Sequence, residues 1–111
     1  MRQTDHRRAP RKPIELSATF SYLAGTWVSA TGEAVTLDLS ECGALIRSSR
    51  ALEVGEILAL ILRLDNSKHV VLEGRVTHVV QADGVYKVGV AFRNLTPEDQ
   101  YLIELQVLKK P

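Results

Sequence analysis

The chain has 111 residues, of which 45% are hydrophobic and 24% are charged, which is ordinary for one soluble globular domain. No apolar run approaches the ~20 residues that cross a bilayer, and the charged N-terminus excludes a secretory signal. The single cysteine, Cys42, excludes an internal disulfide and a cysteine-rich metal site. We therefore expect a cytoplasmic protein of one domain.

The charge is unevenly distributed along the chain. The first 13 residues carry five Lys or Arg and one Asp, whereas the rest carries nine Lys or Arg and twelve Asp or Glu. A basic arm on a mildly acidic body favours an anionic partner held at one edge. General nucleic-acid binding is disfavoured, because it usually spreads positive charge over a whole face.

Residues 1–13 show no hydrophobic periodicity and contain two prolines, so we expect an extended, flexible arm. The arm carries three closely spaced arginines, Arg7, Arg8 and Arg11. A guanidinium pairs bidentately with phosphate or with the O6/N7 edge of guanine, and its flat face can stack on a purine. The cluster therefore suits a ligand containing phosphate and guanine, although a solvated basic tail is the alternative.

From residue 14 onward the body of the chain reads as short strands with one buried face each. The predicted inward positions are Ile14, Leu16, Ala18, Phe20 and Tyr22; Val35, Leu37 and Leu39; Leu58, Leu60, Leu62 and Leu64; Val70, Leu72, Val76 and Val80; and Tyr86, Val88, Val90 and Phe92. A further short strand is expected over 44–47, and Asp83-Gly84 is a strong hairpin signal. Six antiparallel strands with tight turns predict a mainly all-β fold, which removes its exposed edges by closing into a barrel.

The C-terminal segment changes to helical periodicity. Thr96 is an expected N-cap, followed by Pro97 and two acidic residues, so we predict a helix over 97–108. The expected apolar face consists of Leu102, Leu105 and Leu108, joined by Tyr101 and Ile103. This helix is expected to cover one side of a barrel domain that spans 14–111.

A second polar cluster lies at a predicted strand end, in the sequence Asp-Leu-Ser-Glu-Cys-Gly at 38–43. Strand alternation predicts that Asp38 and Ser40 share the polar face. The carboxylate would accept hydrogen bonds from a guanine Watson–Crick edge, and the hydroxyl would add another. Gly43 would allow a tight turn and the close approach of a ligand. An ordinary strand end also accounts for this cluster when it is taken alone.

Neither a metal site nor a catalytic site is expected. The three histidines are scattered without a second ligand type, and His78 is predicted on the apolar face of its strand. A triad of Ser40, His78 and Asp38 is rejected, because no nucleophile elbow or oxyanion signature accompanies it. Arg47, which follows the second cluster, is expected on the solvated surface, with phosphate neutralisation as its alternative role.

Taken together, an R-x-x-x-R element before the first strand and a later D-x-S-x-x-G at a strand end resemble the PilZ domain family. Residues 88–99 also resemble the family's last strand, with a Gly-x-x-Phe pattern that runs into the C-terminal helix. The resemblance covers nearly the whole chain. It implies a six-stranded barrel that binds the bacterial second messenger cyclic di-GMP, often as an intercalated dimer.

The resemblance also implies the ligand-binding residues, which are Arg7, Arg8, Arg11, Asp38, Ser40 and Gly43. The arginines would contact phosphates and guanines, and the other three would hold a guanine on the barrel. Many members have a second glycine at the position of Cys42, which is a variable one. The implied protein is a receptor without cofactor or enzymatic activity that acts on an unidentified protein partner, in motility or biofilm regulation.

Two other functions are weighed against this receptor. The first is an adaptor of the same fold that acts on partners without nucleotide, but degenerate members of that kind lack the motifs that this chain has. The second is a barrel that binds single-stranded nucleic acid by aromatic stacking. Aromatic residues make up only 5% of the chain and fall mainly on predicted inward positions, which counts against it.

Overall fold

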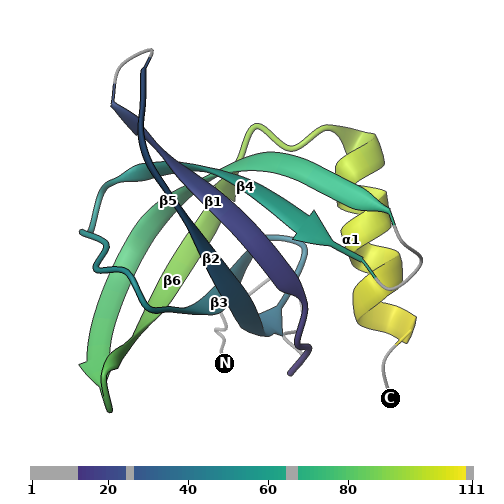
Figure 1. Cartoon of the computed structure of the whole chain (residues 1–111). Helices are drawn as coiled ribbons and strands as arrows, with labels where there is room; N and C mark the ends of the chain where they lie inside the picture. The colour runs from purple at the N-terminus through teal and green to yellow at the C-terminus, as the bar shows by residue number, and fades with distance from the viewer. Residues whose placement is uncertain (1–12, 25–26, 65–67, 110–111) are drawn as a thin grey trace, which may run out of the picture.

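The computed structural model describes residues 13–24, 27–64 and 68–109 (Figure 1). The elements in chain order are β1 (Ser17–Ala24), β2 (Trp27–Leu39), β3 (Gly43–Ser48), β4 (Ile57–Arg63), β5 (His69–Ala82), β6 (Val85–Arg93) and α1 (Pro97–Lys109). The predicted basic arm, including Arg7, Arg8 and Arg11, lies outside the described residues except for Pro13.

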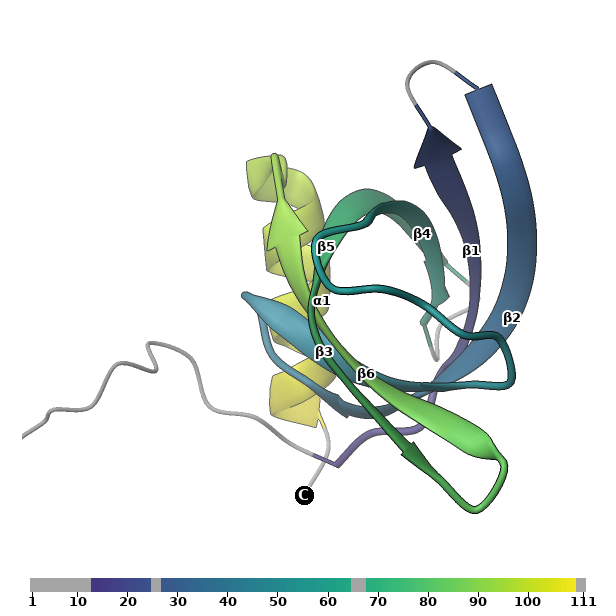
Figure 2. The same ribbon diagram turned by 90° about the vertical axis from the view of Figure 1, so that its left-hand side faces the viewer.

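The six strands form a closed antiparallel barrel in the order β1-β2-β3-β6-β5-β4. This confirms the predicted architecture. The β1–β2 and β5–β6 hairpins are long, and they project from the barrel in opposite directions (Figure 2). The second of them turns at Asp83 and Gly84, with φ of 54° and 79°, as the predicted Asp-Gly hairpin requires.

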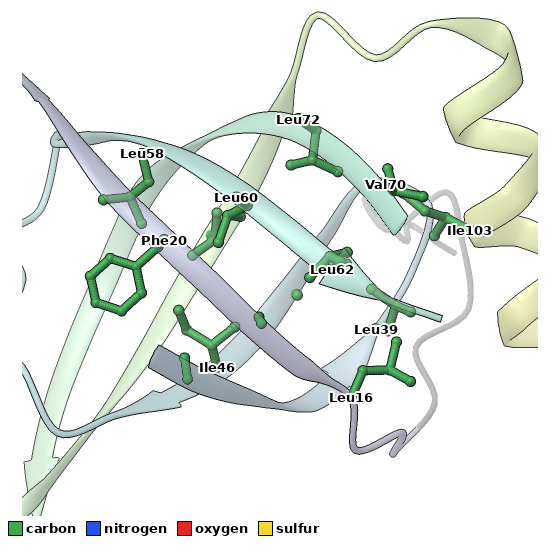
Figure 3. Close-up of a cluster of buried hydrophobic side chains, with 14 of the residues drawn as sticks. Leu16, Phe20, Leu39, Ile46, Leu58, Leu60, Leu62, Val70, Leu72 and Ile103 are labelled. Atoms are coloured by element: carbon green, nitrogen blue, oxygen red, sulfur yellow. The ribbon is translucent and has the colours of Figure 1, made fainter. Parts of the chain in front are cut away.

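The core is built from alternate residues of the strands, which meet inside the barrel (Figure 3). Phe20, Leu58, Leu60, Leu62 and Val70 are all 0% exposed. Full burial of each such side chain stabilises the fold by about 1.5–3 kcal/mol. The inward faces predicted for β1, for β4 and for most of β6 are therefore correct.

A β-bulge in β2 changes its inward face. Thr36 pairs with Ile46 and Asp38 with Leu45, so that Leu37 is an extra residue without a partner of its own on β3. Thr36 is consequently buried with Leu39, whereas Val35 and Leu37 are only half-buried. The predicted inward positions of Val35 and Leu37 are wrong, because one inserted residue shifts the alternation.

A second bulge occurs in β5, where Val76 pairs with Val90 and His78 pairs with Gly89. Here Thr77 is the extra residue. Val70, Leu72 and Val76 precede the bulge and are buried as predicted. Beyond the bulge Val80 is 53% exposed and His78 is exposed, so their predicted inward positions are wrong for the same reason.

The helix begins as predicted, since the backbone N–H of Asp99 donates to Thr96 Oγ1 at 3.1 Å. It covers one end of the barrel (Figure 1) and inserts Ile103 beside Val70 (Figure 3). The predicted apolar face is partly wrong. Ile103, Gln106 and Val107 are buried with Leu102 half-buried, and the exposed residues are Tyr101, Leu105 and Leu108. Two sets of apolar residues recur at helical spacing, and the set that packs against the barrel contains the β-branched residues Ile103 and Val107.

Within the described part of the chain, no helix is both long enough and apolar enough to cross a membrane.

Candidate functional site

The turn between β2 and β3 is held together by Ser40. Its backbone N–H donates to the Gly43 carbonyl at 2.9 Å, and its Oγ accepts from the Cys42 N–H at 3.1 Å. The Phe92 N–H donates to the Cys42 carbonyl at 2.9 Å, which fastens the turn to β6. Ser40 is only 2% exposed, so the expectation that it shares an exposed polar face with Asp38 is wrong. In this geometry its hydroxyl shapes the turn, as serine side chains often do.

Gly43 follows as the first residue of β3, where space requires a glycine. A Cβ on Gly43 would lie 2.4 Å from the backbone carbonyl oxygen of Val90 on β6. The φ of Gly43 is not positive, so its backbone does not adopt the left-handed conformation. The close approach of β3 and β6 therefore requires a glycine here, whereas a left-handed turn conformation does not.

Asp38 is the outward member of the motif. The bulge in β2 presents its half-buried side chain next to Leu45, whose backbone N–H donates to Asp38 Oδ1 at 3.2 Å. A hydrogen bond from the backbone fixes the orientation of the carboxylate on the outer surface of the barrel. A carboxylate held in this way can accept hydrogen bonds from a ligand with adjacent N–H groups, such as a guanine edge.

The outer surface beside Asp38 continues across three further strands. Asp38 pairs with Leu45, Leu45 with Gly89, and Gly89 with His78, so these four residues form one outward row. This row could not be predicted, because the two bulges that create it cannot be recognised from alternation alone. A register that included both bulges would have placed His78 outside.

A basic surface hollow lies on the same outer face of the barrel, toward the strands β1 and β4. It has a volume of about 280 Å³, and its charged lining residues are Arg47 of β3, Arg63 of β4 and Glu33 of β2, so that positive charge is in excess by one. Arg47 is exposed, as the sequence predicted, and follows Leu45 by two positions on the outward face of β3. Positive charge therefore flanks the row that contains Asp38.

The segment that leads out of the N-terminal arm is anchored to β2. Ile14 and Leu16 are buried in the core, and Thr36, which is 0% exposed, lies between them. Thr36 Oγ1 accepts from the Leu16 N–H at 2.8 Å and donates to the Ile14 carbonyl. The Thr36 N–H also donates to the Leu16 carbonyl at 2.9 Å. Residues 14–16, which we call the root of the arm, are thus fixed to β2 at Thr36, two positions before Asp38.

The motif turn also contacts the C-terminal helix. Gln100 Nε2 of α1 donates to Glu41 Oε1 at 2.7 Å, and Glu41 lies directly after Ser40. A side-chain hydrogen bond with Glu41, together with its negative charge, raises the pKa of the neighbouring Glu104 above its ordinary value of 4.5. These side chains connect the motif turn to α1.

We expect Glu104→Gln to stabilise the fold near neutral pH. A carboxyl whose pKa is raised in the folded state contributes stability below its unfolded pKa and loses it as the pH rises through the folded pKa. Glutamine keeps the hydrogen bond without acquiring charge, so it avoids that loss. Thermal melts of both proteins should show a gain at about pH 7 that shrinks toward about pH 4. A gain in a Glu41→Gln background, or one independent of pH, would contradict this cause.

Among the described residues, no three His, Cys, Asp or Glu side chains are grouped so as to hold a metal ion. Ser40 and His78 do not lie together in the structure. Ser40 is buried in its turn, whereas His78 lies three strands away on the outer row. Among the described residues of this surface, Asp38 offers a hydrogen-bond acceptor and Arg47 an exposed positive charge.

Comparisons with known proteins concern the fold and the family of the chain. No curated protein matches the chain in a sequence search. The inhibitor of motility MotI from Bacillus subtilis is similar in structure, with a TM-score of 0.81 and 15% identity over 95% of this chain and 50% of MotI. The PilZ domain of YcgR from Escherichia coli, solved with c-di-GMP, has a TM-score of 0.77 and 15% identity over 95% of this chain and 91% of that one.

The K. pneumonia MrkH–c-di-GMP complex has a TM-score of 0.75 and 17% identity over 96% of this chain and 52% of MrkH. The chain thus spans about half the length of MotI and of MrkH. These identities establish a shared fold. The sequence itself matches the PilZ domain over residues 5–108, which is nearly its full length. The chain therefore belongs to the PilZ domain family.

Proposed function

We propose that this chain is a receptor for cyclic di-GMP that converts ligand binding into a change in its interaction with a partner protein. Membership of the PilZ domain family supports the proposal. Two similar structures, those of YcgR and MrkH, were solved with c-di-GMP. The observation that carries it furthest is the anchoring of Ile14 and Leu16 to Thr36, two positions before Asp38, because the arginine-bearing segment leads into the barrel at this point.

The reach of the chain supports this arrangement. Arg11 lies three positions before Ile14, a span of at most about 11 Å when the chain is extended. Ile14 is hydrogen-bonded to Thr36, and Asp38 lies two positions further along β2. Arg11 is therefore within reach of a ligand that touches Asp38, and Arg7 and Arg8 can approach from further out along the arm.

We assign different roles to the six residues of the two motifs. Arg7, Arg8 and Arg11 pair with phosphates and guanines, while Asp38 accepts hydrogen bonds from a guanine edge. Ser40 and Gly43 act as positioning residues, since both are buried and support the turn that follows Asp38. Arg47, exposed on the same face, supplies additional positive charge for phosphate.

Ligand binding would tie the arm to the barrel and so change the surface offered to a partner. The contact from Glu41 to Gln100 provides a second route, from the motif turn to α1. We place this function in the cytoplasm and assign the chain no enzymatic activity. Such a switch requires the ligand to bind the docked arm more tightly than the free one.

Calorimetric titration of c-di-GMP into the intact chain tests the proposal. The wild type is expected to bind, and Arg7→Ala/Arg11→Ala should weaken binding by at least about tenfold, since each bidentate guanidinium contact contributes ~1–3 kcal/mol. Asp38→Asn should also weaken binding, because an amide can still accept from Leu45 but cannot accept two guanine N–H groups as a carboxylate does.

Arg2→Ala/Lys12→Ala is the matched control, because it also removes two positive charges from the arm, but at positions outside the motif. It should retain binding much closer to that of the wild type. Absence of binding by the wild type would refute the receptor and leave an adaptor without nucleotide. Equal losses in both double variants would show that only the net charge of the arm matters, against the assigned roles of Arg7 and Arg11.

A further inference from the structure

The two β-bulges of the barrel lie at the same level, on either side of the β3–β6 pair. The bulge in β2 turns Asp38 outward opposite Leu45, and the bulge in β5 turns His78 outward opposite Gly89. Leu45 and Gly89 are themselves paired across β3 and β6. Bulges re-aim side chains and are common beside functional sites. Here, two of them direct one polar side chain each to the two ends of a single outward row.

The ring of His78 lies over Gly89. A Cβ on Gly89 would be 2.1 Å from Cε1 and 2.4 Å from Nδ1 of the imidazole, so any other residue there would displace the ring. Gly89 has an ordinary backbone, as it is not among the described residues with positive φ. Its glycine therefore serves to seat the imidazole against the barrel surface.

The extra residue of the bulge holds the ring from its edge. Thr77 Oγ1 lies 3.3 Å from His78 Nδ1, within hydrogen-bond distance. The imidazole is thus supported by Gly89 beneath it and by the Thr77 hydroxyl beside it, while the residue as a whole stays exposed. An aromatic ring fixed in this way on an open surface is a preformed stacking platform, which loses little conformational freedom when a ligand binds.

The row has the dimensions of a nucleotide site. Three strand spacings of ~4.8 Å place the backbones of Asp38 and His78 about 14 Å apart, and the ring reaches back from β5 over β6. Leu45 provides an apolar floor beside Asp38, and Gly89, which has no side chain, leaves room for the imidazole to lie against the barrel. A ligand with two flat bases can meet the carboxylate with the edge of one and the imidazole with the face of another.

The geometry points to His78 as a ligand-contacting residue whose imidazole stacks on a guanine base of c-di-GMP. This inference rests on the proposed function and adds a contact that neither sequence motif contains. His78 determines how the second part of the ligand is oriented across the barrel. Stacking on an aromatic side chain tolerates a change of ring as long as a flat face is present.

The test compares His78→Ala and His78→Phe by calorimetric titration of the intact chain with c-di-GMP. His78→Ala should bind about tenfold or more weakly, as expected for the loss of one base–aromatic stack, and His78→Phe should restore most of the affinity. Val71→Ala is the control on the same strand, since Val71 is also strongly exposed but pairs with β4, away from the row. It should bind as the wild type does.

Ring-proton NMR signals of His78, assigned by their absence from His78→Ala, provide a readout that a merely structural role would not change. They should move upfield when c-di-GMP is added. Binding by the wild type together with unchanged affinity in His78→Ala would overturn the inference and leave the proposed function intact. Equal weakening in His78→Ala and His78→Phe would overturn stacking, whereas no binding by the wild type would refute the proposed function itself.

Discussion

Gly43→Ala is expected to destabilise the fold by about 1–3 kcal/mol in the absence of any ligand, the usual cost of overpacking a well-packed site. The added Cβ would lie 2.4 Å from the Val90 carbonyl oxygen, which belongs to the backbone of the neighbouring strand and cannot rotate away. The strands β3 and β6 would have to separate where Gly43 pairs with Ala91. The stabilising effect of alanine on the unfolded chain, ~0.4–1 kcal/mol, is too small to compensate.

Denaturant titration of the unliganded protein measures this effect, with Cys42→Ala as the control. Cys42 is the adjacent residue and is exposed, so its truncation should leave stability nearly unchanged. The comparison separates two explanations of a glycine in a ligand-binding motif. A Gly43→Ala variant that is as stable as the wild type but no longer binds c-di-GMP would show that the ligand, not the packing of β3 on β6, requires the glycine.

The barrel could be predicted from the sequence because its core strands obey simple alternation. Every second residue of β4, and of β1 as far as Phe20, is apolar and buried, and the Asp-Gly hairpin and the threonine cap mark element ends chemically. The bulges could not be predicted in this way. An extra residue such as Leu37 or Thr77 leaves the local composition unchanged and only reverses the side of the strand on which the following residues lie.

The candidate site was predicted only in part, because the same bulges could not be foreseen. The motif at 38–43 was located correctly at the end of β2, but alternation assigned Ser40 to the surface and His78 to the core, and both are the reverse. The face of α1 was misassigned because helical spacing fits two apolar stripes. Which stripe is buried depends on the shape of the barrel end, and no local pattern encodes this shape.

We expect Thr36→Val to weaken the attachment of the arm's root to β2. Valine matches the shape of threonine but lacks its hydroxyl, so the Leu16 N–H and the Ile14 carbonyl would each lose a buried hydrogen-bond partner. Each unsatisfied buried group costs about 1–3 kcal/mol, which makes a total of several kcal/mol. Thr36→Ser retains the hydroxyl and should cost much less.

Hydrogen exchange distinguishes local loosening from a general loss of stability. In Thr36→Val, the Leu16 amide should exchange faster by a larger factor than amides in the β4–β5 pair, which report global unfolding. If Leu16 and β4 accelerate equally, Thr36 only supports the core and does not hold the arm's root. If Leu16 accelerates selectively, c-di-GMP affinity should fall with it, because the arginines of the arm would no longer start from a fixed point beside Asp38.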